Sequence, residues 1–278
     1  MSEPAPNRDD LVYLQDLVLL QQARSIDLGS PDPRTKSRDR LQRLFVELQK
    51  VIRPEVTLEI GAHAAMLSRR MPRLGAEAHA FEANPYTHQA FAPMLAKRAP
   101  DVRYRHLAIS DVDGEVTFQV KESRAGIPVQ KVAGNNSLMV RSDAAFAYEE
   151  VTVPSTRTDS YLKEQGLQDR QFSAWIDVEG ALGRVTAGFG TALQSCASLI
   201  VEVEEVAYWQ GQMLYIDAMR YFASQGLVPV ARDFEARHQF NMVYLRGDVL
   251  VRPAVRQVLA RYFKSGEAVP DRAGTASP

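Results

Sequence analysis

The chain has 278 residues, 45% of them hydrophobic, which is enough for one large core or for one core with an appendage. Its 33 lysines and arginines nearly balance 34 aspartates and glutamates, so the charge favours neither a nucleic-acid partner nor a membrane surface. The single cysteine, Cys196, excludes an intramolecular disulfide and a zinc site made of several cysteines, and we expect its thiol to be buried and inert.

The N-terminal region predicts helices that precede the first strand. Residues 1–9 are polar and contain proline, as disordered segments do. From residue 10, apolar side chains recur at helical spacing, at Leu11, Leu14, Val18 and Leu19. After a break at residues 29–33, a second helix carries one apolar face, made of Leu41, Leu44, Phe45, Leu48 and Ile52. We expect residues 1–53 to form a helical extension that is a lid, a cover for a sheet or the surface of a homodimer.

Short apolar runs alternate with helical patterns through the main domain, which we assign to residues 54–265. The predicted strands are residues 57–60, 78–82, 102–109, 172–178, 199–203, 227–232 and 240–246. The predicted helices between the first six are residues 64–71, 85–98, 158–165, 180–193 and 211–225. This alternation indicates an α/β protein with a doubly wound, mostly parallel sheet and helices on both faces.

The ends of the domain depart from this alternation. The link at residues 233–239 is too short for a parallel crossover, so the seventh strand should run antiparallel. A final helix at residues 255–263 leads to a tail, residues 266–278, that we expect to be flexible. With no signal peptide and no apolar run that could span a bilayer, we expect a cytoplasmic protein.

Residues 115–154 interrupt the alternation. Short strands are predicted at residues 115–120 and 150–153, on either side of a polar, turn-rich loop, Gly-Asn-Asn-Ser, at residues 134–137. An excursion of this length inside a compact domain is more often functional than idle.

Two carboxylates, Glu59 and Glu82, lie near the ends of the first two predicted strands, about one strand–helix–strand unit apart. Doubly wound proteins bind nucleosides at the carboxyl ends of their strands, where Glu82 could accept hydrogen bonds from both ribose hydroxyls. The alternative is that Glu82 is an ordinary exposed acid.

Gly61 permits a sharp turn after the first strand, and the free N–H groups of the helix that follows could bind a carboxylate. The loop, Gly-Ala-His-Ala-Ala, lacks the second glycine that a pyrophosphate needs, which disfavours NAD; the His63 ring is expected to line the pocket.

A second group of acids lies at the end of the fourth predicted strand. Asp177 and Glu179 share one face if the strand continues through Glu179, and diverge if the chain turns there. Asp177 could bind an amino group, align a hydroxyl or hold a metal; Glu179 could cap a helix or act as a base. With glutamates 202, 204 and 205 they could bind a divalent cation, which the sequence does not favour over a solvated acid cluster. His238, near Asn241, is either a general base or a surface histidine.

Together these segments resemble the FkbM-type family of S-adenosylmethionine-dependent methyltransferases, from about Leu58 to Arg246. The residues that carry the resemblance are 59–65 (Glu-Ile-Gly-Ala-His-Ala-Ala), 81–85 (Phe-Glu-Ala-Asn-Pro), 108–110 (Ala-Ile-Ser), 113–114 (Asp-Gly), 175–180 (Trp-Ile-Asp-Val-Glu-Gly) and 199–202 (Leu-Ile-Val-Glu). Three residues depart from the family pattern: His63 replaces an asparagine, Ala65 a glycine and Trp175 a lysine. A positive φ at Ala65 would cost about 1 kcal/mol or more.

The resemblance implies the class I methyltransferase fold, with seven strands and an antiparallel last one, and an O-methyltransferase that uses S-adenosylmethionine. It implies a cofactor site formed by Glu59, Gly61, His63, Glu82, Ala83, Ala108, Ser110 and Asp177. The proton of the acceptor hydroxyl would pass to Asp177 or His238, with Glu179 also a catalytic candidate.

The resemblance also bears on the acceptor, which would be a small molecule such as a sugar, a polyketide or another secondary metabolite. Asn136, Ser137 and Asn241 are the residues that we expect to bind it, with the N-terminal helices shaping the pocket. The competing hypotheses are a module that has kept the fold and the cofactor but lost catalysis, and an NAD-dependent oxidoreductase, which the glycine pattern disfavours.

Overall fold

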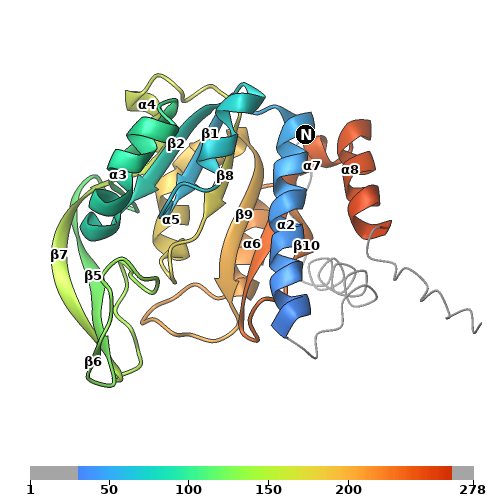
Figure 1. The fold of residues 1–278 in the computed structure, drawn as a ribbon. Helices are drawn as coiled ribbons and strands as arrows, with labels where there is room; N and C mark the ends of the chain where they lie inside the picture. The colour runs from blue at the N-terminus through green and yellow to red at the C-terminus, as the bar shows by residue number, and fades with distance from the viewer. Residues whose placement is uncertain (1–30, 265–278) are drawn as a thin grey trace, which may run out of the picture.

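The computed structural model describes residues 31–264, which fold around a central sheet of seven strands (Figure 1). Its strands are β1 (Val56–Ile60), β2 (Glu77–Glu82), β3 (Val102–His106), β8 (Phe172–Ile176), β9 (Cys196–Glu204), β10 (Leu227–Arg232) and β11 (Gln239–Arg246). Their order is β3-β2-β1-β8-β9-β11-β10, and β11 runs antiparallel to both of its neighbours. The predicted α/β class and the antiparallel last strand are confirmed.

Helices cover both faces of this sheet, as predicted. One face packs against α4 (Thr158–Glu164), α5 (Leu182–Phe189) and α6 (Tyr215–Ser224) through a core that includes Phe81, Phe172 and Phe222. The other packs against α2 (Pro31–Ile52), α3 (Pro85–Arg98) and α8 (Pro253–Lys264), with the short α7 (Gly247–Leu250) between β11 and α8. The alternation of apolar side chains along each strand therefore builds two cores, one on each side of the sheet.

Helix α2 is a cover for the sheet. The apolar face that the sequence predicts for it is buried in the second core, and its Phe45 meets Trp175 of β8 edge to face, with ring centroids 6.4 Å apart. The helix begins at Pro31, inside the predicted break, because proline is tolerated in the first turn of a helix. The helix predicted from residue 10 and the tail at residues 266–278 lie outside the described residues.

Several predicted elements change their bounds. The helix predicted at residues 64–71 is wrong: the segment holds turns and two short 3-10 helices, η1 (Ser68–Arg70) and η2 (Pro72–Leu74). The strand predicted at residues 102–109 is divided into β3 and β4 (Ala108–Ile109), which belong to different sheets. The helix predicted at residues 180–193 is shortened to α5, which is followed by the 3-10 helix η3 (Gly190–Ser195), and α6 begins four residues later than predicted.

The interruption in the alternation is a second sheet, in the order β4-β7-β5-β6. Strands β5 (Gly114–Arg124) and β7 (Phe146–Thr156) are longer than predicted, form an antiparallel ladder, and project from the main sheet with β6 (Ile127–Pro128) at their tip (Figure 1). A small core of Ala108, Val116, Phe118, Val120 and Val153 lies against it. We call this second sheet the arm.

The thiol of Cys196 is buried at the start of β9, and burial raises its pKa to about 12. The expectation of a buried thiol is confirmed. We expect iodoacetamide to leave the native protein unmodified and to modify one thiol per chain in denaturant, as mass spectrometry would detect. Rapid labelling of the native protein would contradict this packing.

Across residues 31–264, every helix is too short or too polar to traverse a bilayer.

Candidate cofactor site

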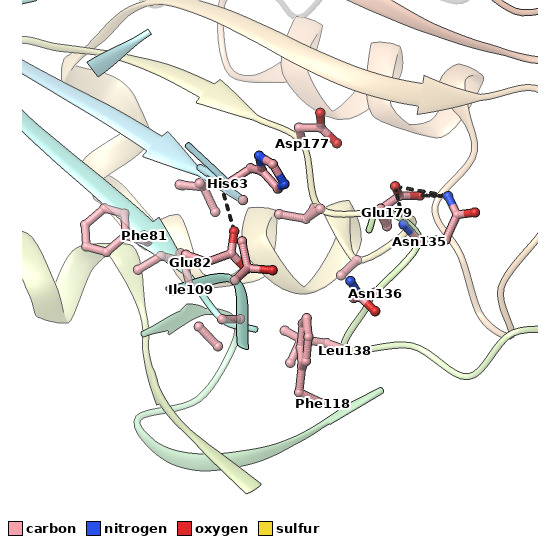
Figure 2. Close-up of a pocket in the computed structure, with 18 of the residues that line it drawn as sticks. His63, Phe81, Glu82, Ile109, Phe118, Asn135, Asn136, Leu138, Asp177 and Glu179 are labelled. Atoms are coloured by element: carbon pink, nitrogen blue, oxygen red, sulfur yellow. Dashed lines mark hydrogen bonds between the residues drawn. The ribbon is translucent and has the colours of Figure 1, made fainter. Parts of the chain in front are cut away.

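A cavity of about 340 Å³ lies at the carboxyl ends of β1, β2 and β8, between the main sheet and the arm (Figure 2). This volume is in the range of small-molecule sites, about 300–1,000 Å³. Of the residues predicted for the site, the cavity walls contain Gly61, His63, Glu82, Ala83, Ala108, Asn136, Asp177 and Glu179. The strand-end positions of these side chains, far apart in sequence, bring them together because parallel strands end at one edge of the sheet.

Glu82 ends β2 inside this cavity and is fixed by the backbone around it. Its Oε2 accepts a hydrogen bond from the N–H of His63 at 2.8 Å, and its Oε1 accepts one from the N–H of Asn84, also at 2.8 Å. Burial raises the pKa of Glu82 to about 7, and these two N–H groups partly offset that effect. A carboxylate has about four acceptor positions, so two remain for a ligand that offers two hydroxyls.

Glycine is required at position 61, where the backbones that follow β1 and β8 come into close contact. Its φ is +80°, and a Cβ at this position would lie 1.7 Å from the carbonyl oxygen of Asp177. The N–H of Asp177 donates to the carbonyl of Ile60 at 2.9 Å, and the N–H of Gly61 donates to that of Phe81 at 3.0 Å. The absent side chain thus lets three strand ends meet and sets Asp177 on the cavity wall.

Glu59, in β1, positions the loop after this strand through two hydrogen bonds. Its buried carboxylate accepts hydrogen bonds from the N–H groups of Leu67 at 3.2 Å and Ser68 at 2.6 Å. Burial raises the pKa of Glu59. The loop residues His63 and Ala65 have φ values of 44° and 52°, so this segment cannot be the predicted α-helix. Glu59 is outside the main cavity and its predicted contact with a cofactor stays a prediction; its observed role is to shape the loop.

Ala65 adopts the positive φ that the sequence analysis considered. The left-handed conformation costs about 1–2 kcal/mol for a residue with a Cβ. Replacing Ala65 with glycine would remove this cost, but it would add about 0.5–1 kcal/mol of backbone entropy and lose a buried methyl worth about 0.8 kcal/mol. We expect Ala65→Gly to change the free energy of unfolding in urea by less than about 1 kcal/mol. A gain above 2 kcal/mol would show that the loop is strained.

The segment at residues 129–137, between β6 and β7, forms one wall of the cavity. Asn84 caps α3 and donates from Nδ2 to the carbonyl of Lys131 at 2.7 Å, while His63 Nε2 lies 3.3 Å from the carbonyl of Val132. The N–H of Asn135 donates to Glu179 Oε1 at 2.9 Å, and Ser137 Oγ donates to the carbonyl of Glu179 at 2.7 Å. The polar loop predicted from sequence therefore closes onto the end of β8.

The other end of the cavity is apolar. It is lined by Phe81, Ala108, Ile109, Phe118 and Leu138. Sequence analysis missed Phe118 and Leu138: their alternation predicts burial, but no local signal says that the arm turns them toward this cavity. Ser110, predicted to line it, is directed elsewhere, because its Oγ lies 2.7 Å from Ser155 Oγ. An apolar slot beside a ribose-type acceptor suits a planar base.

Asp177 and Glu179 reach the cavity by different routes. Asp177 follows β8 directly, and burial, then the neighbouring Glu179, raises its pKa to about 7. Glu179 has a φ of 48°, so the strand has ended and the chain turns there. Yet the hydrogen bonds from Asn135 bring its carboxylate back, and an oxygen of each acid lies within 4.8 Å of the other. Both alternatives considered from sequence were incomplete.

Besides Glu59 and Ser110, three further predicted residues lie away from the cavity walls. His238 Nδ1 lies 3.3 Å from Glu205 Oε2, beyond the end of β9. Asn241 donates from Nδ2 to Asp233 at 2.9 Å. Ser137 holds the carbonyl of Glu179 behind the wall. The catalytic role of His238 and the acceptor contacts of Asn241 and Ser137 stay predictions, and these positions lend them no direct support.

No curated protein matches the chain. Among solved structures, it is similar to the Burkholderia thailandensis 1,6-didemethyltoxoflavin N1-methyltransferase, solved with bound 1,6-didemethyltoxoflavin and S-adenosylhomocysteine (13% identity, 88% of this chain and 93% of that one, TM-score 0.37). It is also similar to the magnesium protoporphyrin IX methyltransferase of Synechocystis (8% identity, 88% and 100% coverage, TM-score 0.42). These distant likenesses carry no argument about the substrate.

The family comparison is more specific. The model of the methyltransferase FkbM domain matches residues 58–229, which is more than half of the chain and includes β1, β2, β8, β9 and the arm. The match contains the residues that form the cavity, and the strand order is that of the class I methyltransferase fold. The chain belongs to the FkbM family of methyltransferases.

Proposed function

We propose that the protein is an S-adenosylmethionine-dependent O-methyltransferase that acts on a hydroxyl group of a small molecule. The observation that carries the cofactor assignment is Glu82, a buried carboxylate at the end of β2 with two acceptor positions free and an apolar slot beside it. This arrangement suits a nucleoside. Family membership supports methyl transfer as the reaction.

The chemistry of the cavity walls fits the parts of this cofactor. Ala108, Ile109, Phe118 and Leu138 would contact the adenine, and Glu82 would accept hydrogen bonds from the ribose hydroxyls. The loop from Gly61 to His63 and the acid Asp177 would hold the methionine part, whose ammonium group Asp177 can pair with. When bound, S-adenosylmethionine supplies a methyl group on a sulfonium, which needs no further activation.

The chain's own part in the reaction is to orient the acceptor and to take its proton. The acceptor oxygen would form a bond to the methyl carbon with its own lone pair as the sulfur–carbon bond breaks, and the electron pair of the broken bond would stay on sulfur to give S-adenosylhomocysteine. The hydroxyl proton passes to a carboxylate, for which Asp177 on the cavity wall is our assignment. Much of the rate would come from holding the two reactants in line.

The acceptor is proposed to be a sugar, a polyketide or another secondary metabolite with a free hydroxyl. The nearby segment at residues 133–138 would form part of its pocket, since Asn136 lines the cavity. The competing hypothesis is a module that binds the cofactor without turnover. It rests on the departures from the family pattern at His63 and Ala65. The structure nevertheless gives both residues the positive φ of this loop.

Calorimetric titration with S-adenosylhomocysteine tests the cofactor assignment. We expect one site per chain with a micromolar dissociation constant, followed by transfer of isotopically labelled methyl from S-adenosylmethionine to hydroxylated acceptors in a screen. Binding without transfer to any acceptor would favour the non-catalytic module. Absence of binding to a folded protein would overturn the proposal.

The pKa of Glu82 gives the binding a pH dependence. Below pH 7 the folded carboxyl holds a proton and loses acceptor capacity, so the affinity for S-adenosylhomocysteine should fall between pH 8 and pH 6. The free energy of unfolding of the unliganded protein should depend on pH in the opposite direction. The pKa of the unfolded carboxyl is near 4.5, so from pH 4.5 to 7 the folded state binds more protons, and its free energy of unfolding decreases as the pH rises.

Titrations and urea unfolding at several pH values measure both effects. Other buried acids titrate in the same window, so each pH profile is compared with that of Glu82→Gln, and the difference belongs to Glu82. Identical profiles for the two proteins would contradict the assignment.

A further inference from the structure

A group of four carboxylates lies beside the cofactor cavity at the carboxyl ends of β8 and β9. Asp177, Glu179 and Glu202 each offer one oxygen, and these three oxygens lie within 4.8 Å of one another. Glu204 is the next residue on the same face of β9, because side chains alternate along a strand, and it raises the pKa of both Asp177 and Glu202. The ends of these two strands thus direct four acids toward one place.

No cation of the described residues forms an ion pair with this group, although Arg141 and Lys121 act at longer range on Glu204 and Glu179. Within residues 31–264, no lysine, arginine or histidine nitrogen lies at ion-pair distance from these four acids. The nearest acid in sequence, Glu205, behaves differently: it pairs with His238 at 3.3 Å. A concentration of like charge that the fold leaves unpaired is costly unless a ligand supplies the opposite charge.

Two of the carboxylates also have a buried oxygen that lacks a hydrogen-bond partner. These are Oε1 of Glu202 and Oε1 of Glu204, and the Glu204 residue is 2% exposed. Buried polar atoms nearly always have a partner, so each such atom calls for an explanation. An oxygen donor that is fully buried and unpartnered is suited to coordinate a metal ion.

We propose that Asp177, Glu179 and Glu202 bind one hard divalent cation, Mg²⁺, Mn²⁺ or Ca²⁺, with Glu204 next to it. Oxygen-only donors are those that these ions prefer. Oxygens on opposite sides of one ion lie about 4 Å apart for Mg²⁺ and about 5 Å apart for Ca²⁺. Because the three oxygens lie within 4.8 Å of one another, a single ion could bridge the three acids with small side-chain movements.

The site has a specific place in the proposed reaction, on which this part of the inference rests. Asp177 lines the cavity, so an acceptor hydroxyl bound to the cation would lie next to the methyl donor. A metal-bound hydroxyl loses its proton more readily, which would help Asp177 or solvent to accept it. The sequence could not favour this site, because the turn at Glu179 and the convergence of Glu202 are set by tertiary contacts.

Mn²⁺ binding to the full chain tests the proposal without cofactor or acceptor. Electron paramagnetic resonance of free Mn²⁺ during titration counts the bound ions. We expect one Mn²⁺ per chain, displaced by excess Mg²⁺ or Ca²⁺, and at least tenfold weaker binding in Asp177→Asn and in Glu202→Gln. The matched control is Glu205→Gln, which removes the same charge three positions from Glu202 but from a carboxylate paired with His238; it should bind Mn²⁺ within twofold of the native chain.

The outcomes separate this inference from the proposed function. No Mn²⁺ binding, or equal weakening in Glu202→Gln and Glu205→Gln, would overturn the metal site. S-adenosylhomocysteine titration of Glu202→Gln and Glu205→Gln checks that these variants are folded and reads the cofactor site independently. Urea unfolding checks the folding of Asp177→Asn, because Asp177 is itself assigned to the cofactor. Normal S-adenosylhomocysteine binding with no Mn²⁺ binding would overturn the metal site and leave the proposed function standing, and the reverse result would do the opposite.

Discussion

Replacing Glu82 with glutamine is expected to weaken S-adenosylhomocysteine binding by about 10- to 100-fold. A hydrogen bond to a charged acceptor contributes about 1.5–3 kcal/mol, and each 1.4 kcal/mol is a tenfold change in affinity. Glutamine keeps the shape of the side chain but removes its charge. The carboxylate accepts hydrogen bonds from the N–H groups of His63 and Asn84, and the amide nitrogen of glutamine would face one of these two donors. Calorimetric titration at pH 8, where the native carboxylate is ionised, measures the loss.

The control for this variant is Glu115→Gln, which makes the same change on the exposed edge of β5. It should bind S-adenosylhomocysteine with native affinity. Urea unfolding of Glu82→Gln in the absence of ligand shows whether the loop at His63 still folds. A stable Glu82→Gln protein with native affinity would remove the ribose contact from the proposed function.

Gly61→Ala is expected to destabilise the protein by more than about 4 kcal/mol, among the largest effects of any single substitution. The positive φ alone costs about 1–2 kcal/mol. In addition, the new Cβ would lie 1.7 Å from the carbonyl oxygen of Asp177, and this atom belongs to the backbone, so no side-chain rotation can relieve the contact. The ends of β1 and β8 must separate. Urea or thermal unfolding measures the change.

A matched control separates the two causes. Gly75 has nearly the same φ, +85°, but an added Cβ there would meet nothing within 4 Å. Gly75→Ala should therefore cost only the conformational part, about 1–2 kcal/mol. If the two variants lost equal stability, the close approach of the strand ends would not be the reason for glycine at position 61.

Sequence periodicity predicted the main sheet well because its strands are short, buried and separated by amphipathic helices. The rule that parallel strands end at one edge then placed Glu82 and Asp177 in the same site. Prediction from sequence failed where tertiary contacts determine the local structure. Glu59 accepts hydrogen bonds from the N–H groups of Leu67 and Ser68, in the middle of the helix predicted at residues 64–71. The hydrogen bonds from Asn135 bring Glu179 back to Asp177 after the strand has ended.

The positions of His238 and Asn241 could not be predicted for a similar reason. Both are near the sheet edge in sequence, but their partners, Glu205 and Asp233, are fixed by the register of β11 with β9 and β10. The reach of the arm was underestimated because β5 and β7 continue past their buried residues with exposed ones, which carry no apolar alternation.

The arm has a core of its own, and this divides the chain into parts that can change at different rates during evolution. Substitutions on the outer face of β5 and β7 leave the two cores of the main sheet intact, since the small cluster around Phe118 and Val120 is separate from both. Relatives should therefore differ most in the arm and least at the ends of β1, β2 and β8. Exchanging the segment at residues 129–137 between such relatives, with Ala108, Phe118 and Leu138 kept, is a direct way to move acceptor preference while keeping one methyl-donor site.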